Sequence, residues 1–151
     1  MSASARSVEV VVTGMPVPRW RARVGRFCAR ILAEAGYDEW EVAVLLCDDK
    51  RIAELNGRYR GKSGPTDVLS FPREEKIAAG RVTGDVAISL PMLRRNAASF
   101  GVTEDEELKR LLAHGMLHLA GMDHGRGRGG PMLALQEKLL ERTQAIHIMA
   151  E

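Results

Sequence analysis

The sequence predicts a protein that combines short β-strands with amphipathic α-helices. Three kinds of observation support this: β-branched runs bounded by turn formers, apolar residues at the spacing of a helix, and glycine or proline where those patterns stop. A composition of 45% hydrophobic and 28% charged residues is typical of folded rather than disordered chains. With no internal repeat or linker, we expect one domain over residues 1–151.

The first third of the chain predicts two strands with a helix between them. Residues 8–13 and 41–47 are apolar or β-branched runs and favour strands. Pro18 suits the first turn of the helix, and Gly36 is a suitable stop. The apolar residues of this helix recur at helical spacing: Trp20, Val24, Phe27, Ile31 and Ala35. One apolar stripe is therefore expected to pack on the sheet.

The middle of the chain predicts a short helix, a polar loop and two more strands. Asp48 or Asp49 can cap a helix that ends near Gly57. A polar loop is then expected over residues 57–66. The two strands are expected at residues 67–71, ending at Pro72, and at residues 85–89.

Three helices are expected in the last part of the chain. Pro91 begins the first, and Gly101 ends it. Thr103 and Glu106 have the spacing of a capping box, which predicts a second helix that runs to Gly121. Its apolar stripe is Leu108, Leu111, Leu112, Gly115 and Leu119. Residues 132–144 carry leucines at helical spacing and predict the last helix.

Charge and cysteine content exclude some classes of protein. A net charge of +2 is too small for binding nucleic acid by bulk electrostatics, and the arginines between Arg19 and Arg30 are interpreted as a solvated helix face. Cys28 and Cys47 lie in apolar segments, which indicates core thiols in a reducing cytoplasm. No signal peptide is recognised, and no apolar run approaches the ~20 residues of a membrane span.

Three of the four histidines lie close together in the sequence, and they predict a metal site. His114 and His118 are four residues apart on one helix, so both imidazoles can reach one ion. Gly121 permits a left-handed turn that brings His124 to the same ion. Three neutral nitrogen ligands leave a fourth position for water, as in catalytic zinc sites, although they also suit nickel and copper. His147 is isolated and is expected to be exposed.

The histidine spacing also matches the ligand pattern of metzincin peptidases. In those enzymes a glutamate beside the first histidine serves as general base. Here the corresponding residue is Gly115, which cannot accept a proton. The sequence therefore favours a hydrolase of another class.

Residues 114–124 resemble the signature H-G-x-L-H-L-x-G-x-D-H of the YbeY family of endoribonucleases. Residues 55–72 are similar to that family's LN-x-x-YR and PTDVLSFP motifs, and residues 84–89 to its GDIVIS strand. The resemblance covers roughly residues 8–144. After His124, where relatives carry an acidic stretch, this chain has the basic, glycine-rich segment 125–130.

The resemblance implies an α+β fold with a small mixed sheet and a zinc-dependent endoribonuclease activity on single-stranded RNA. It further implies a role in maturation of the 16S ribosomal RNA 3′ end and in ribosome quality control, with the small ribosomal subunit or its proteins as partners. Arg60 would then be a catalytic and phosphate-binding residue, Lys62 a second phosphate contact, and Asp123 either an orienting carboxylate for a histidine or a turn former.

Two questions stay open on the sequence alone. The metal could polarise a phosphoryl oxygen or activate water, and the proton acceptor could be metal hydroxide, Asp123 or the RNA 2′-hydroxyl. The chain could instead be a ribosome assembly factor in which zinc mainly holds the last two helices together. A coordination shell of three histidines and water would indicate catalysis, whereas a fourth protein ligand would indicate a structural role.

Overall fold

Four strands form one mixed sheet in the order β1-β2-β4-β3. In this computed structural model, which describes residues 5–73, 80–122 and 130–149, β1 (Arg6–Val12), β2 (Glu39–Cys47) and β4 (Arg81–Ser89) are parallel. The edge strand β3 (Val68–Pro72) runs antiparallel to β4. The expected α+β fold with a small mixed sheet is therefore confirmed. No helix of the described residues has the length and apolarity needed to cross a membrane.

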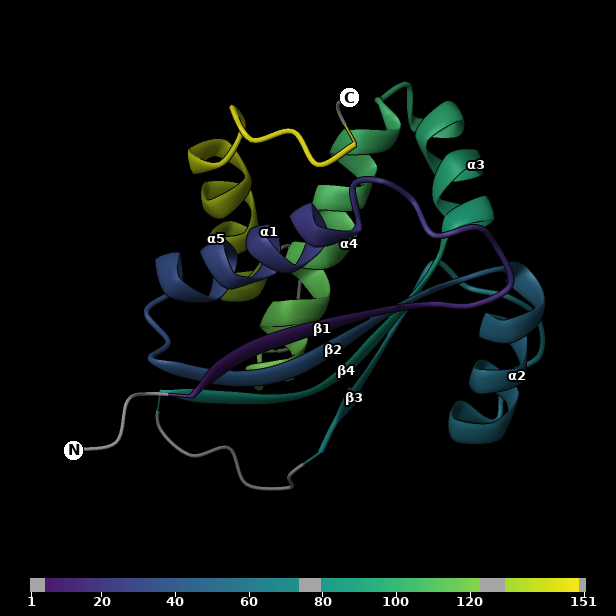
Figure 1. Cartoon of the computed structure of the whole chain (residues 1–151), viewed down its shortest axis with the longest axis horizontal. Coiled ribbons are helices and arrows are strands. Elements are labelled where there is room, and N and C mark those ends of the chain that lie inside the picture. Colours follow the sequence, from purple (N-terminus) through teal and green to yellow (C-terminus); the bar gives the residue numbers. More distant parts are fainter. Residues whose placement is uncertain (1–4, 74–79, 123–129, 150–151) are drawn as a thin grey trace.

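Four helices cover one face of the sheet in the described chain, and one further helix lies at the end of the other face (Figure 1). The covered face carries α1 (Arg21–Glu34), α3 (Leu90–Phe100), α4 (Glu104–Leu119) and α5 (Gly130–Arg142). α4 occupies the middle of this layer, where it contacts β3, β4 and the other three helices. Alternate residues of the strands, such as Val42, Val44 and Val86, pack against these helices and form the main core.

The opposite face of the sheet carries a second, smaller core beneath α2 (Asp49–Arg60). Ile52 of α2 packs there against Cys47, Leu69 and Ala87 of the strands. Cys28 lies in the main core, and burial raises its pKa to about 12 and that of Cys47 to about 11, so both thiols stay protonated as expected of core residues.

The helix ends follow the capping signals of the sequence at several places. Thr103 and Glu106 form both hydrogen bonds of a capping box at the start of α4. Asp48 Oδ1 accepts a hydrogen bond from the Arg51 amide at the start of α2. Gly101 ends α3 in a left-handed conformation, with φ of 69°. α1, in contrast, begins at Arg21, so Pro18 precedes the helix rather than opening it.

Two further predicted boundaries were wrong. α2 continues through Gly57 to Arg60 and ends at Gly61, whose φ is 63°, so the first part of the expected polar loop is helical. Glycine lowers helix stability by only about 1 kcal/mol, and the second core anchors this helix. β4 begins at Arg81 rather than Asp85, because its pairing with the whole length of β2 carries it through Gly84.

Candidate active site

Two histidines of α4 converge at the end of the helix that faces β3. His114 and His118 lie on one side of the helix, as their four-residue spacing predicts. Their Nε2 atoms are 3.1 Å apart, and their ring centroids are 4.6 Å apart. Both side chains are half-buried. The pair therefore presents two imidazole nitrogens to one point in space.

The distance between these nitrogens fits a shared metal ion. Two nitrogens that are each about 2.0–2.1 Å from a tetrahedral ion lie roughly 3.3 Å apart. His114 Nδ1 is 2.8 Å from Gln136 Oε1 of α5, and since an amide oxygen only accepts, Nδ1 carries the proton. His114 Nε2 therefore keeps its lone pair for a ligand bond, which is the usual arrangement of metal-binding histidines.

The third predicted ligand, His124, and its neighbour Asp123 lie outside the described residues, as does most of the glycine-rich segment. Within residues 5–73, 80–122 and 130–149, no three His, Cys, Asp or Glu side chains come together as a metal site. The predicted turn before this segment is present, because Gly121 follows the end of α4 with φ of 88°. The triad with His124 stays a prediction.

Arg60 and Lys62 line the same cleft as the two histidines. This cleft has a volume of about 410 Å³ and lies at the β3 edge of the sheet, between α4 and the last turn of α2. Arg60 is the last residue of α2, and Gly61 turns the chain so that Lys62 follows on the cleft wall. In the part of the chain that the structure describes, no carboxylate forms an ion pair with either. The cleft thus joins two imidazoles and two cations.

Asn56 closes the loop that carries Lys62. Its side chain is buried, and Nδ2 donates to the carbonyl oxygen of Gly64 at 3.0 Å. The backbone carbonyl oxygen of Asn56 accepts a hydrogen bond from the backbone amide of Lys62 at 3.3 Å. Asn56 also lines the cleft, so it holds the loop against the end of α2. The sequence analysis did not single out this residue, although a buried polar side chain beside an apolar helix stripe is the signal that points to it.

Asp67, the first residue of the strand expected over residues 67–71, is part of a polar network at the cleft. Its Oδ2 accepts a hydrogen bond from Asn96 at 3.1 Å and lies 3.8 Å from Arg110 Nη2. Arg110 in turn binds both carboxylate oxygens of Glu107, at 2.8 and 2.6 Å. The hydrogen bonds to Glu107 raise the pKa of Arg110, so its charge is permanent. Asp67 is therefore fixed and partly neutralised.

Gly115 faces the sheet rather than the cleft. A Cβ atom at this position would lie 2.8 Å from Cγ1 and 3.0 Å from Cγ2 of Val86 in β4. A glutamate here would therefore be directed into the helix–sheet contact and not toward His114. The structure thus adds a steric reason to the argument against metzincin chemistry.

His147 lies away from the cleft. Its side chain is 64% exposed, and its Nδ1 is 3.6 Å from Asp105 Oδ2. It lines a separate hollow between α4 and the C-terminal segment. The expectation that His147 is exposed and not a ligand of this site is consistent with its position.

Comparisons with known proteins give one consistent family. The sequence profile described as endoribonuclease YbeY matches residues 12–144. A protein named endoribonuclease YbeY from Treponema pallidum (strain Nichols) is 39% identical over 144 residues, which cover 91% of this chain and 90% of that protein. One of the same name from Sulfurihydrogenibium sp. is 44% identical over 116 residues, covering 75% and 76%.

A solved structure shares the fold. The solution structure of TM1509 from Thermotoga maritima superposes with a TM-score of 0.67 at 28% sequence identity. The match covers 92% of this chain and 90% of the Thermotoga chain. The shared fold therefore extends over most of the length of both chains.

Proposed function

Because this chain belongs to the endoribonuclease YbeY family, we propose that it cleaves single-stranded RNA in the cleft between α4 and the end of α2. The observation that carries the proposal is the convergence of His114 and His118 in a cleft that Arg60 and Lys62 also line. Imidazole nitrogens and cationic side chains suit a phosphodiester substrate better than a peptide, whose scissile bond carries no charge.

The proposed cofactor is one zinc ion held by His114, His118 and His124. The 3.1 Å separation of the two Nε2 atoms and the hydrogen bond from His114 to Gln136 support the first two ligands. When bound, such an ion supplies Lewis-acid stabilisation of the charge that develops on the phosphate. Gln136 holds the His114 ring in one tautomer and orientation, and Asp123 is proposed to do the same for His124.

Arg60 and Lys62 are proposed to hold the RNA backbone. The guanidinium of Arg60 offers a planar fork of donors for two phosphate oxygens, and the Lys62 ammonium adds a point charge on the same wall. Asn56 and Gly61 hold the backbone turn that places both cations on the cleft wall. Both residues therefore position the substrate without contacting the ion.

The proposed biological substrate is ribosomal RNA, with maturation of the 16S 3′ end as the reaction and the small ribosomal subunit as partner. The family of the chain supports this, since its relatives carry the name endoribonuclease. Two buried, unpaired thiols in the described chain support a reducing compartment, and we place the protein in the cytoplasm.

Metal analysis of matched histidine variants tests the ligand assignment. Protein purified without added metal is expected to contain about one transition-metal ion per chain, and His118→Ala to lose most of it. His147→Ala is the matched control, because this residue lies away from the cleft. Equal losses from the two variants would show that the site lies elsewhere. A fourth protein ligand in the coordination shell would favour a structural ion and an assembly factor without cleavage.

A further inference from the structure

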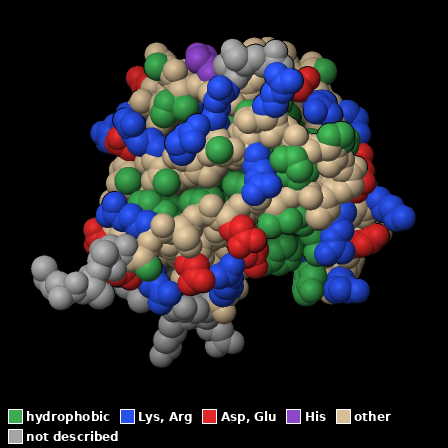
Figure 2. All heavy atoms as spheres, in the orientation of Figure 1, with side chains coloured by type: hydrophobic (Ala, Val, Ile, Leu, Met, Phe, Trp, Pro, Cys, Tyr) green, Lys and Arg blue, Asp and Glu red, His purple; other side chains and the backbone are tan. Residues whose placement is uncertain are grey.

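A second hollow lies next to the cleft, on the face of the sheet that carries only α2 among the described helices, here called the open face. It has a volume of about 810 Å³ and runs between the strands and α2. Figure 2 shows hydrophobic side chains gathered in this region. Arg60, Ser70 and Pro72 line both this groove and the histidine cleft. The groove and the histidine cleft therefore lie on either side of the edge strand β3, and Arg60 lies where they meet.

The register of the sheet explains why the surface is hollow here. Glu9, Ala43, Asp85 and Phe71 form one row across the four strands on the open face. Val11, Leu45, Ala87 and Leu69 form the next row. Both central strands thus contribute an alanine, while larger side chains stand on either side. The two alanines, one on each central strand, lower the surface between larger neighbours and leave a groove floored by the sheet.

An exposed aromatic ring forms one wall of this groove. Tyr59 of α2 is 61% exposed, although it is a large side chain. It meets Phe71 of β3 edge to face, with ring centroids 5.4 Å apart and an angle of 65° between the planes. This contact holds the tyrosine ring in place, as aromatic pairs of this geometry do. The groove therefore offers a fixed aromatic surface beside Arg60.

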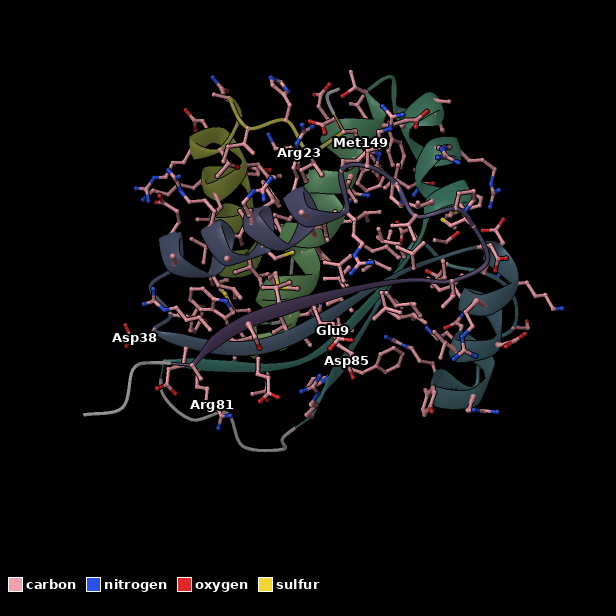
Figure 3. The ribbon with its side chains drawn as sticks, in the orientation of Figure 1. Glu9, Arg23, Asp38, Arg81, Asp85 and Met149 are labelled. Atoms are coloured by element: carbon pink, nitrogen blue, oxygen red, sulfur yellow. The ribbon has the colours of Figure 1, made fainter. Side chains whose placement is uncertain are left out.

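The charges around the groove favour a neutral ligand group over a phosphate. Asp85 lines the groove, and its Oδ1 accepts a hydrogen bond from Arg73 at 2.8 Å. Glu9 lies in the same row and points to the same face (Figure 3). Because Arg73 is already paired with Asp85, it adds no unpaired cation to the floor of the groove, whereas Arg60 at the junction would attract a phosphate. A nucleotide matches this pattern, because its base is neutral and its phosphate is charged.

We propose that the groove is a stacking subsite for one unpaired base, whose neighbouring phosphate is held by Arg60. This inference rests on the proposed function and adds a source of selectivity to it. A base stacks on an exposed aromatic ring with little dependence on its identity. A base inside a duplex already has both faces covered, so it cannot occupy the groove. Tyr59 would therefore select single-stranded RNA at the nucleotide beside the cleavage site.

The test compares RNA binding by two matched aromatic variants. All proteins carry His114→Ala, so that the RNA stays intact, and binding is measured by fluorescence anisotropy with a labelled single-stranded oligonucleotide. Tyr59→Leu keeps the apolar contact with Phe71 but loses the ring, and is expected to weaken binding by about 5- to 160-fold, the range for loss of one base–aromatic stack. Tyr59→Phe is expected to bind as the tyrosine protein does. Phe100→Leu replaces another exposed aromatic, distant from the groove, and is expected to have no effect.

An abasic scan identifies which part of the RNA occupies the groove. Removing one base at a time should weaken binding to the tyrosine protein at one position next to the cleavage site, and the Tyr59→Leu protein should be insensitive at that position. If both proteins gave the same profile, the groove would hold no base and the inference would be wrong, even while the protein with His114 restored still cleaved RNA. If Tyr59→Leu instead dissociated a dimer of the protein and left its affinity for RNA unchanged, the groove would be an interface between two copies, and the inference would likewise be wrong. Failure of the unsubstituted protein to cleave any RNA would overturn the proposed function as well.

Discussion

Replacing Gly115 by alanine tests how closely α4 approaches the sheet. The new methyl group would lie 2.8 and 3.0 Å from the two γ-carbons of Val86, closer than carbon atoms pack in proteins. Val86 is fully buried in a central strand, and its branched Cβ together with the packed core restricts rotation about χ1. The valine therefore cannot turn away, and either α4 or β4 must move.

The size of the effect follows from two opposing terms. Alanine in place of glycine stabilises a helix by about 1 kcal/mol. Overpacking a filled core costs about 1–3 kcal/mol, so a net loss of roughly 1 kcal/mol is expected for Gly115→Ala. In α1, a Cβ at Gly25 would lie 3.7 Å from its nearest atom, an ordinary contact distance. Gly25→Ala should therefore show only the increase in helix stability. The two variants should thus differ by about 2 kcal/mol, or about 4–8 °C in Tm.

Thermal unfolding followed by circular dichroism measures this difference. Gly25→Ala should raise the Tm and Gly115→Ala should lower it, and Val86→Ala should relieve the second change by about 1 kcal/mol in a double-mutant cycle. RNA cleavage should fall in Gly115→Ala and not in Gly25→Ala, since α4 carries the two histidines. Equal increases in Tm for both glycine variants, or strict additivity with Val86→Ala, would refute the close approach.

Three further perturbations are open to measurement. Gln136→Leu should weaken zinc binding about 10- to 100-fold in a chelator competition, because His114 loses its orienting acceptor. Burial acts to raise the pKa of Asp49, but hydrogen bonds from Ser89 and Arg95 lower it overall. A folded pKa below the unfolded value of about 3.9 stabilises the fold above that pH, so the Tm deficit of Asp49→Asn should shrink as pH falls below about 4. Gly84→Ala should cost about 2–5 kcal/mol by denaturant titration, because φ is 141° and the methyl would lie 2.7 Å from the Phe71 carbonyl oxygen.

Local signals were sufficient to predict most of the elements. The capping box at Thr103 and the left-handed glycine at Gly101 depend on neighbouring residues alone, and both are present. The extension of α2 through Gly57 could not be predicted, because it depends on the packing of Ile52 and Leu55 against the open face of the sheet. Tertiary contact there outweighs the low helix propensity of glycine.

The candidate site was predictable in its ligands but not in its supporting residues. The spacing of His114 and His118 determines that they share a helix face, whichever fold surrounds them. Gln136 is 22 residues from His114, and only the packing of α5 on α4 brings the two together. Its one sequence signal is a polar residue on the buried side of a helix, between Met132 and Leu139. Such a residue needs a partner, but the sequence does not say which one.

The burial of several charged side chains could also not be predicted from the sequence. Glu107 belongs to the acidic first turn of α4, yet it is only 1% exposed. Its partner Arg110 is three residues away, and the pair reaches Asp67 and Asn96 from other elements. Lys109 is buried too, and it donates to the carbonyl oxygens of Thr143 and Ile146 beyond α5. Helical periodicity identifies an apolar stripe but not charged residues that are paired beside it.

The central claim is that RNA is cut in the cleft that joins the histidines to Arg60, and one matched assay tests it. Unsubstituted protein, His114→Ala and Arg60→Glu are each incubated with a single-stranded RNA oligonucleotide and with a peptide library, and metal content is measured on the same samples. Unsubstituted protein should cleave RNA only, and His114→Ala, which also controls for contaminating nuclease, should not. Arg60→Glu should keep its metal but lose at least about tenfold in kcat/KM, because a charge-assisted hydrogen bond worth about 1.5–3 kcal/mol becomes a repulsion. Equal RNA cleavage by all three proteins, or cleavage of peptides alone in a His114-dependent way, would contradict the account.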